Sequence, residues 1–185
     1  GIAALPWVLW RRLSGKRPVA AIRERLTGRV RVADCPKNHC RIWLHGVSVG
    51  EVQLIRPLVN ELQNQADLRN QLIDCVVSSS TTTGLEVATK THEQDHVFPC
   101  PLDVSWAIKQ TLNRVRPDVL VLAELEIWPN LLRLAEECKI PVVVVNGRMS
   151  ERSYQGYKRL GRIAAFMVQR ISLVLSRSQE DSDRI

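Results

Sequence analysis

The chain has 185 residues, of which 45% are hydrophobic, and it carries a formal net charge of +7. This length suits one domain with a sizeable core, and the hydrophobic content excludes an intrinsically disordered chain. The five cysteines are odd in number and include no C-x-x-C pair, which favours a reducing compartment over a disulfide framework.

The net charge lies in the first forty residues. Residues 1–31 hold eight basic residues and one acidic residue, and they include an apolar stretch at 2–10 with Trp7 and Trp10. Basic blocks bind nucleic acid, attach to anionic lipid or solvate a helix, and the tryptophans favour lipid over nucleic acid. The apolar stretch is too short to span a bilayer by itself, which takes about 20 residues. We expect residues 1–40 to form a basic, apolar-tipped, membrane-proximal segment on an anionic membrane surface.

From residue 41 onward two hydrophobic periods alternate. Helix-like stretches, such as 51–66 and 103–115, separate short runs rich in β-branched residues, which recur at 41–45, 72–78, 95–100, 118–123, 141–146 and 172–176. This alternation is typical of βαβ units. The fold class predicted for residues 41–185 is therefore α/β, a Rossmann-like parallel sheet with helices on both faces.

The turn after the first predicted strand carries the most informative motif, Trp43-Leu-His-Gly-Val-Ser-Val-Gly-Glu51-Val. Small residues permit a tight turn, and Glu51 stands where the next helix should begin, at the sheet edge where ligands of such folds bind. Local features leave two interpretations open: a functional carboxylate, or a charge that favours the helix N-terminus by about 0.3–1 kcal/mol. We interpret His45, directly before this turn, as a packing or hydrogen-bonding residue. The G-x-S-x-G letters around Ser48 lack the Asp and His of a serine hydrolase in order.

Polar groups follow the other predicted strands at the same edge. The hydroxyl-rich stretch 78–84 suits phosphate or sugar oxygens at a helix N-terminus, although an ordinary helix cap needs one hydroxyl. Glu124 and Glu126 end the fourth strand and, with Glu51, can divide acid and base roles or stabilise a developing cation. The alternative is that one of Glu124 and Glu126 only caps the helix that opens at Pro129. Arg148 follows the fifth strand and can bind a carboxylate or phosphate, whereas pairing with a neighbouring acid is the structural alternative. No Asp or His joins these acids at ligand spacing, and the Cys35–Cys40 stretch reads as a loop, so we predict no metal site.

These motifs resemble the signatures of the 3-deoxy-D-manno-octulosonic acid (Kdo) transferases. They occur in the order of that family and cover nearly the whole chain. The matching stretches are 43–52, Ser79-Ser-Thr-Thr-Thr-Gly84, Pro101-Leu-Asp103, Arg116-Pro-Asp118, Glu124-Leu-Glu-Ile-Trp-Pro-Asn130 and Asn146-Gly-Arg-Met-Ser-Glu-Arg-Ser153.

The resemblance implies the N-terminal, acceptor-binding half of a GT-B glycosyltransferase, with the donor-binding domain outside this chain. Such enzymes transfer Kdo from CMP-Kdo to a lipid A precursor in lipopolysaccharide biosynthesis, at the cytoplasmic face of the inner membrane of Gram-negative bacteria. Glu51 then resembles the general base of an inverting reaction, and Glu124 the acid that helps to stabilise the transition state. No cofactor, metal or nucleic-acid partner is implied.

The expected substrate contacts come from the turn, the hydroxyl-rich stretch and the residues after the fifth strand. They are Ser48, Gly50, Ser79, Thr81, Thr82, Thr83, Gly84, Arg148, Ser150 and Ser153. We expect the chain to be a fragment without transferase activity, because the CMP-binding residues of the family belong to the second domain. Two rival classes remain. One is a non-catalytic lipid- or phosphate-binding Rossmann-like module, and the other is a nucleotide-dependent oxidoreductase, which the missing glycine fingerprint disfavours.

Overall fold

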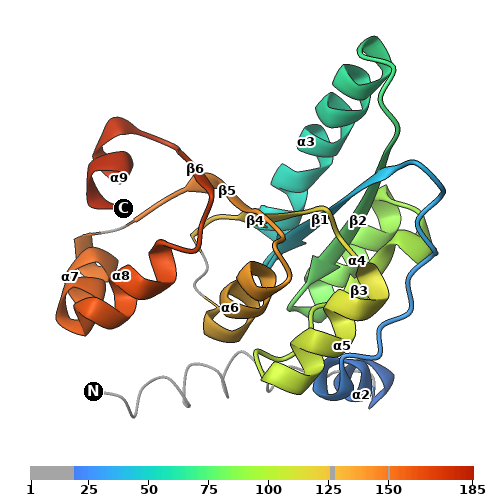
Figure 1. The fold of residues 1–185 in the computed structure, drawn as a ribbon. Coiled ribbons are helices and arrows are strands. Elements are labelled where there is room, and N and C mark those ends of the chain that lie inside the picture. Colours follow the sequence, from blue (N-terminus) through green and yellow to red (C-terminus); the bar gives the residue numbers. More distant parts are fainter. Residues whose placement is uncertain (1–18, 126–127, 150) are drawn as a thin grey trace.

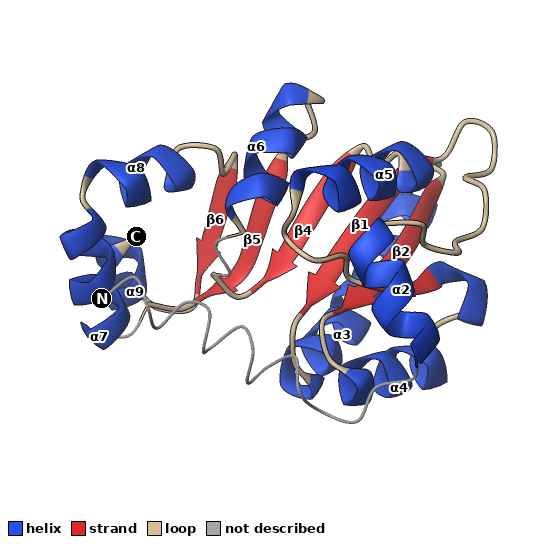
Figure 2. Ribbon diagram, turned by 90° about the horizontal axis from the view of Figure 1, so that it is seen from below, coloured by secondary structure: helices blue, strands red, loops and turns tan. Residues whose placement is uncertain are grey.

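A single parallel sheet organises the structure, a computed structural model that describes residues 19–125, 128–149 and 151–185. Its strand order is β3-β2-β1-β4-β5-β6, and every neighbouring pair is parallel (Figure 2). The strands are β1 (Cys40–Gly46), β2 (Ile73–Ser79), β3 (Val97–Pro99), β4 (Val119–Ala123), β5 (Val142–Gly147) and β6 (Leu173–Ser176). This order is that of the doubly wound α/β fold. The predicted parallel sheet is confirmed, and each predicted strand is present.

Helices cover both faces of the sheet. The long helix α3 and α4 lie on one face, and α5 and α6 lie on the other (Figures 1 and 2). The described helices are α2 (Val19–Thr27), α3 (Val49–Leu68), α4 (Thr82–Thr91), the 3-10 turn η1 (Gln94–His96), α5 (Ser105–Val115), α6 (Pro129–Glu137), α7 (Glu151–Leu160), α8 (Arg162–Val168) and α9 (Gln179–Arg184). The helices predicted at 51–66 and 103–115 are therefore confirmed as α3 and α5.

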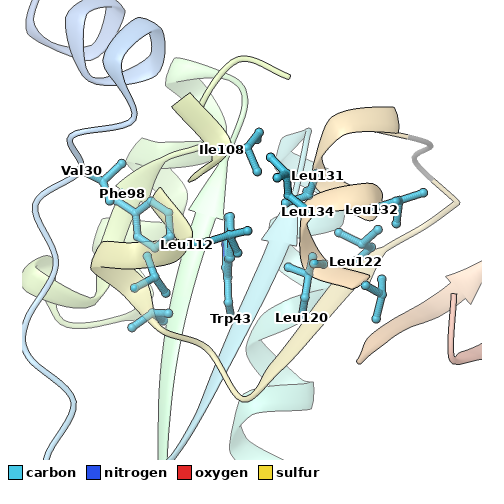
Figure 3. Packing of buried hydrophobic residues seen from close by; sticks show 14 of the residues in the cluster. Val30, Trp43, Phe98, Ile108, Leu112, Leu120, Leu122, Leu131, Leu132 and Leu134 are labelled. Atoms are coloured by element: carbon cyan, nitrogen blue, oxygen red, sulfur yellow. The ribbon is translucent and has the colours of Figure 1, made fainter. Parts of the chain in front are cut away.

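Alternation along the strands divides the core into two layers. Ile42 and Leu44 of β1 pack with the residues under α3 and α4, while Trp43 points to the opposite face. There Trp43 lies among apolar side chains of the neighbouring strands, α5 and α6 (Figure 3), and its ring centroid is 5.5 Å from that of Phe98. Because both faces are covered, the middle of each central strand is a continuous apolar run, at 42–44, 75–77 and 119–123, rather than an alternation with polar residues.

The segment before β1 packs onto this core. Val30 and Val32 are each 5% exposed and belong to the cluster around Trp43, and Ala33 N–H donates to Asp95 O at 2.8 Å. Trp7 and Trp10 lie outside the described residues. Among the residues described, no helix is both long and apolar enough to span a membrane.

A buried ion pair closes the amino-terminal edge of the sheet. Arg41 of β1 and Asp74 of β2 are 1% and 6% exposed, and Arg41 Nε donates to Asp74 Oδ2 at 2.6 Å. The remaining guanidinium nitrogens donate to Val115 O and Ala33 O, and His96 Nε2 lies 3.0 Å from Asp74 Oδ1. Because the polar groups of Arg41 and Asp74 already bind partners within the protein, we assign a structural role to this edge. We therefore look for a ligand site at the opposite, carboxyl-terminal edge of the sheet.

Candidate functional site

The strand order places the candidate site between β1 and β4. The chain leaves β1 for β2 on one side and leaves β4 for β5 on the other, so the two connections diverge to opposite faces of the sheet. A crevice at such a switch point is where open α/β sheets bind their ligands. Glu51 follows β1 and Glu124 follows β4, so both predicted catalytic residues lie at the switch point.

Glu51 is held by the turn that carries it. Ser48 caps α3, and Glu51 in the first turn accepts from Ser48 Oγ and from Val47 N–H, both at 2.7 Å. This arrangement resembles a capping box, except that Glu51 accepts from the N–H of Val47 rather than from the N–H of the N-cap residue Ser48. Gly46 permits it, because a Cβ at that position would lie 3.0 Å from Val52 N and 3.1 Å from Glu51 Cβ. Glu51 is thus a helix-capping charge and also a fixed carboxylate, 7% exposed, at the switch point. Gly50 lies beside it, exposed in the first turn of α3.

Glu124 sits on strained backbone directly after β4. Its φ is +73°, in the left-handed region, and its N–H continues the sheet by donating to Val145 O at 2.8 Å. Such a conformation in a residue other than glycine costs about 1–3 kcal/mol and is concentrated at functional sites. Burial, followed by the negative charge of Glu51, raises the pKa of Glu124, while Arg148 and Arg177 act in the opposite direction. The negative charge of Glu51 therefore acts on Glu124, which places the two carboxylates in the same part of the sheet edge.

The hydroxyl-rich stretch divides into a buried half and an accessible half. Ser78 and Ser79 are fully buried, and Ser79 Oγ donates to Val47 O at 3.2 Å, which ties the stretch to the turn before Glu51. Thr81 caps α4 by accepting from Gly84 N–H at 3.1 Å. Thr82 is half-buried and Thr83 is exposed at the helix N-terminus. The structure thus uses the serines internally and leaves the two threonines at the surface.

His45 belongs to a buried polar network beneath the crevice. Its Nδ1 lies 2.9 Å from Ser78 Oγ, which also accepts from Trp43 Nε1 at 2.7 Å. Burial lowers the pKa of His45 to about 4, so the ring is neutral at physiological pH. The ring meets Trp128, which precedes α6, edge to face with 6.1 Å between centroids. His45 is therefore a hydrogen-bonding core residue that supports the loop after β4, as its sequence position indicated.

The residues after β5 and β6 supply positive charge. Arg148 is exposed, and its neighbour Met149 is anchored by donating its N–H to Asp181 Oδ1 at 2.8 Å. Arg177, 58% exposed at the side chain, also acts on Glu124, and it is absent from the predicted site residues although it follows β6 as Arg148 follows β5. Ser153 is exposed on α7. Glu126 and Ser150 lie outside the described residues.

Two other features lie away from the crevice. A hollow of about 840 Å³ runs along the edge strand β3, between α4 and the extended segment at 30–33, and Thr82 at the start of α4 is part of its lining. Among the residues that the structure describes, one group of side chains is close enough together to share a metal ion: Glu93, Asp95 and His96. This group lies at the amino-terminal edge of the sheet, where His96 contacts Asp74. Neither is placed at the switch point of the sheet, so we assign the candidate site to the carboxyl-terminal ends of β1 and β4.

Fold and site together define a Rossmann-like α/β domain with opposed carboxylates at its switch point. A family model described as "3-Deoxy-D-manno-octulosonic-acid transferase (kdotransferase)" matches residues 20–185. The chain therefore belongs to the Kdo transferase family.

Curated relatives agree with this assignment. The chain is 38% identical to a bifunctional glycosyltransferase/methyltransferase of Fusobacterium nucleatum, over 80% of this chain and 23% of that protein. It is 33% identical to the 3-deoxy-D-manno-octulosonic acid transferase of Haemophilus influenzae, over 82% of this chain and 35% of that protein. The matched part thus spans about a quarter of the first relative and about a third of the second.

A solved structure shares the fold. A protein of Listeria monocytogenes, described as a UDP-N-acetylglucosamine 2-epimerase, superposes with a TM-score of 0.55 at 10% identity. The match covers 79% of this chain and 41% of that protein. At this identity the similarity concerns the fold alone.

Proposed function

We propose that this chain is the acceptor-binding half of a GT-B glycosyltransferase that moves Kdo from CMP-Kdo to a lipid A precursor. The observation that carries the proposal is the pair of opposed carboxylates, Glu51 and Glu124, at the switch point of a Kdo transferase domain. The donor would bind mainly through a second domain, which the greater length of the relatives accommodates. The chain by itself is then without transferase activity.

Glu51 is proposed as the general base. Its two oxygens each accept one hydrogen bond, from Val47 N–H and Ser48 Oγ, and a carboxylate has further lone pairs for a substrate hydroxyl. The acceptor hydroxyl oxygen would form a bond to the anomeric carbon of Kdo while its proton passes to Glu51. The bond from that carbon to the phosphate oxygen breaks on the opposite side, and CMP leaves with the electron pair. The configuration at the anomeric carbon is therefore inverted.

Glu124 is proposed to face the positive charge that develops on the donor sugar. The strained backbone fixes its position before reaction, so that its charge acts without reorganisation in the transition state. Arg148, with Arg177 nearby, would bind the carboxylate or phosphate groups of the substrates.

The acceptor would contact the N-termini of α3 and α4. Thr82 and Thr83 offer accessible hydroxyls, and the free backbone N–H groups of a helix N-terminus suit phosphate or sugar oxygens. Ser48, Gly50, Ser79, Thr81, Gly84, Ser150 and Ser153 complete the proposed substrate-binding set. Within this set, Ser79 would act by holding the turn, since its hydroxyl already donates to Val47 O.

Such an acceptor carries acyl chains, so the proposed place of action is the cytoplasmic face of the inner membrane in Gram-negative bacteria. The basic N-terminal segment supports an anionic membrane surface as partner. The alternative function, a non-catalytic module that binds lipid or phosphate, would keep this surface and have no use for a proton acceptor at Glu51.

The substitution Glu51→Gln in the full-length protein tests the proposal. Loss of the base should lower kcat by about 10²–10⁴-fold, with acceptor binding retained. Glu61→Gln, an exposed change on the same helix, is the matched control and should leave kcat unchanged. Turnover of CMP-Kdo at the wild-type rate by Glu51→Gln would overturn the mechanism and favour the binding module.

A further inference from the structure

Strand β5 ends with an irregularity that changes the direction of the chain. The register of its parallel pairing with β6 shifts between Val144 and Gly147, where β5 contains one residue more than β6. Asn146, within this stretch, has a φ of +53°, in the left-handed region. An extra residue of this kind bends a strand and re-aims the side chains near it. The first side chain after the irregularity is that of Arg148.

Arg148 starts from a position next to that of Arg177. Gly147 is paired with Ser176, and Arg177 N–H donates to Gly147 O at 3.0 Å, so the two arginines follow neighbouring positions of β5 and β6. Both are exposed, and both act against the rise in the pKa of Glu124. Two guanidinium groups therefore lie within electrostatic range of one carboxylate at the switch point.

Helix α9 holds the backbone directly after Arg148. Met149 is 3% exposed, and both of its backbone polar groups are bound. Its N–H donates to Asp181 Oδ1 at 2.8 Å, and its carbonyl oxygen accepts from Arg184 Nη1 at 3.3 Å. Both partners belong to α9, which lies beside β6 (Figure 1). One helix therefore fixes the path of the chain as it leaves β5.

The two side chains of α9 are themselves held in place. Asp181 is 5% exposed, and its Oδ2 accepts from Ser178 Oγ at 2.8 Å, while Ser178 caps α9. Arg184 Nη2 lies 3.2 Å from Glu151 Oε2, in the first turn of α7. Because these contacts restrict the rotamers of both side chains, the hold on Met149 exists before any ligand binds.

We infer that Asp181 and Arg184 are positioning residues for the proposed transfer. They fix the backbone at Met149, so that Arg148 is set beside Arg177 to bind a carboxylate or phosphate group of a substrate. An arginine aimed in advance binds such a group through two parallel hydrogen bonds and loses less conformational freedom on binding. The role in transfer rests on the proposed function, whereas the contacts with Met149 do not.

Steady-state kinetics of the full-length protein test the inference. Asp181→Ala should raise the KM of one substrate by about tenfold or more, because Arg148 then loses its fixed direction. Arg148→Ala should raise the same KM by about 10–100-fold, and Asp181→Ala added to it should cause no further rise. Such non-additivity is expected where one residue acts through the other, whereas a general loss of stability would add to the effect.

The KM that rises identifies the bound group. A rise for CMP-Kdo indicates the carboxylate or phosphate of the donor, and a rise for the acceptor indicates a phosphate of the acceptor. For the donor, weaker inhibition of Asp181→Ala by free Kdo indicates the carboxylate, and weaker inhibition by CMP indicates the phosphate.

Two further variants separate the hold on Met149 from loss of the fold. Asp181→Asn keeps an oxygen that can accept from Met149 N–H, so its KM should stay within about threefold of wild type. Asp183 is exposed on the same helix and accepts from Gln179 Nε2, so Asp183→Ala is the matched control and should leave both KM values unchanged. Near-ultraviolet circular dichroism checks that each variant keeps the wild-type fold.

Amide hydrogen exchange of the 185-residue chain measures the hold without any sugar transfer. Asp181→Ala should speed exchange of the Met149 amide by about tenfold or more, while the amide of Val121 in β4 stays as protected as in wild type.

Three kinetic results would overturn the inference. They are unchanged KM values in Asp181→Ala, an effect of Asp181→Ala that is equally large in the presence of Arg148→Ala, and an Asp181→Asn variant as impaired as Asp181→Ala. Unchanged exchange of the Met149 amide in Asp181→Ala would also contradict it. Each of these results leaves the loss of turnover in Glu51→Gln untouched, so a failure here is distinct from a failure of the proposed function.

Discussion

Gly84 shows how closely single residues are fitted around the hydroxyl-rich stretch. A Cβ at this position would lie 2.2 Å from Ser79 Oγ and 2.8 Å from Thr81 Oγ1. Gly84→Ala should therefore lower the free energy of unfolding by about 1–3 kcal/mol, because the side chains that hold the turn before Glu51 must move. Urea unfolding measures the change.

Gly156 is the control for that substitution. It lies in α7, where a Cβ would meet no atom within 4 Å, so Gly156→Ala should stabilise the chain by up to about 1 kcal/mol. Equal effects of the two substitutions would contradict the packing that we describe around Ser79.

His45 gives a pH dependence of stability with a defined sign. The pKa of His45 falls from 6.5 to about 4 because the ring is buried, so the native state keeps it neutral while the unfolded chain takes up a proton. Stability should therefore decline as the pH falls from 6.5 toward 4, by at most about 3 kcal/mol from this group. Unfolding free energies of wild type and His45→Gln across this range measure the difference. Parallel curves for the two proteins would contradict a buried, neutral His45.

At the residue scale, the sequence predicts where Glu51 lies in the fold, but it does not predict which groups Glu51 contacts. Spacing puts the carboxylate at the start of a helix after a strand, and the structure confirms this. The burial of Ser79 and the left-handed backbone of Glu124 depend on tertiary packing, which local patterns do not encode. Arg177 could have been found by the rule that singled out Arg148, since both follow strands.

At the scale of elements, one buried ion pair reinforces the parallel pairing of β1 with β2 at its amino-terminal end. Asp74→Ala leaves the Arg41 guanidinium buried without its carboxylate, so we expect a loss of about 3–5 kcal/mol in the free energy of unfolding. Glu137→Ala breaks the exposed Arg133–Glu137 pair on α6 and should cost less than about 1 kcal/mol. Chemical denaturation compares the two, and an Asp74→Ala chain as stable as Glu137→Ala would refute the structural role of this edge.

The strands were predictable because a sheet covered on both faces leaves long β-branched runs in the sequence. Even the short β3 and β6 were predicted, because each lies in a run rich in β-branched residues that is followed by a helix-like stretch. Their order was not readable from the sequence, because pairing of β1 with β4 joins segments far apart in the chain. The switch point, and with it the facing of Glu51 and Glu124, therefore required the structure.

At the scale of the whole molecule, the two edges of the sheet have separate roles. The amino-terminal edge is closed by Arg41 and Asp74, and the carboxyl-terminal edge gathers carboxylates, hydroxyls and arginines around the switch point. The proposed transfer of Kdo would take place at this second edge, and the membership of the chain in the Kdo transferase family supports that proposal.

Backbone chemical-shift mapping can establish whether the acceptor sugar binds at the switch point, where the connections that follow β1 and β4 diverge. The probe is a water-soluble, deacylated, phosphorylated glucosamine disaccharide, titrated into the chain. We predict that the amide signals of Val47, Glu124 and Arg148 shift together, while those of Arg41 and Asp74 stay in place. Shifts confined to the hollow beside β3, or to the amino-terminal edge, would refute the proposed acceptor site.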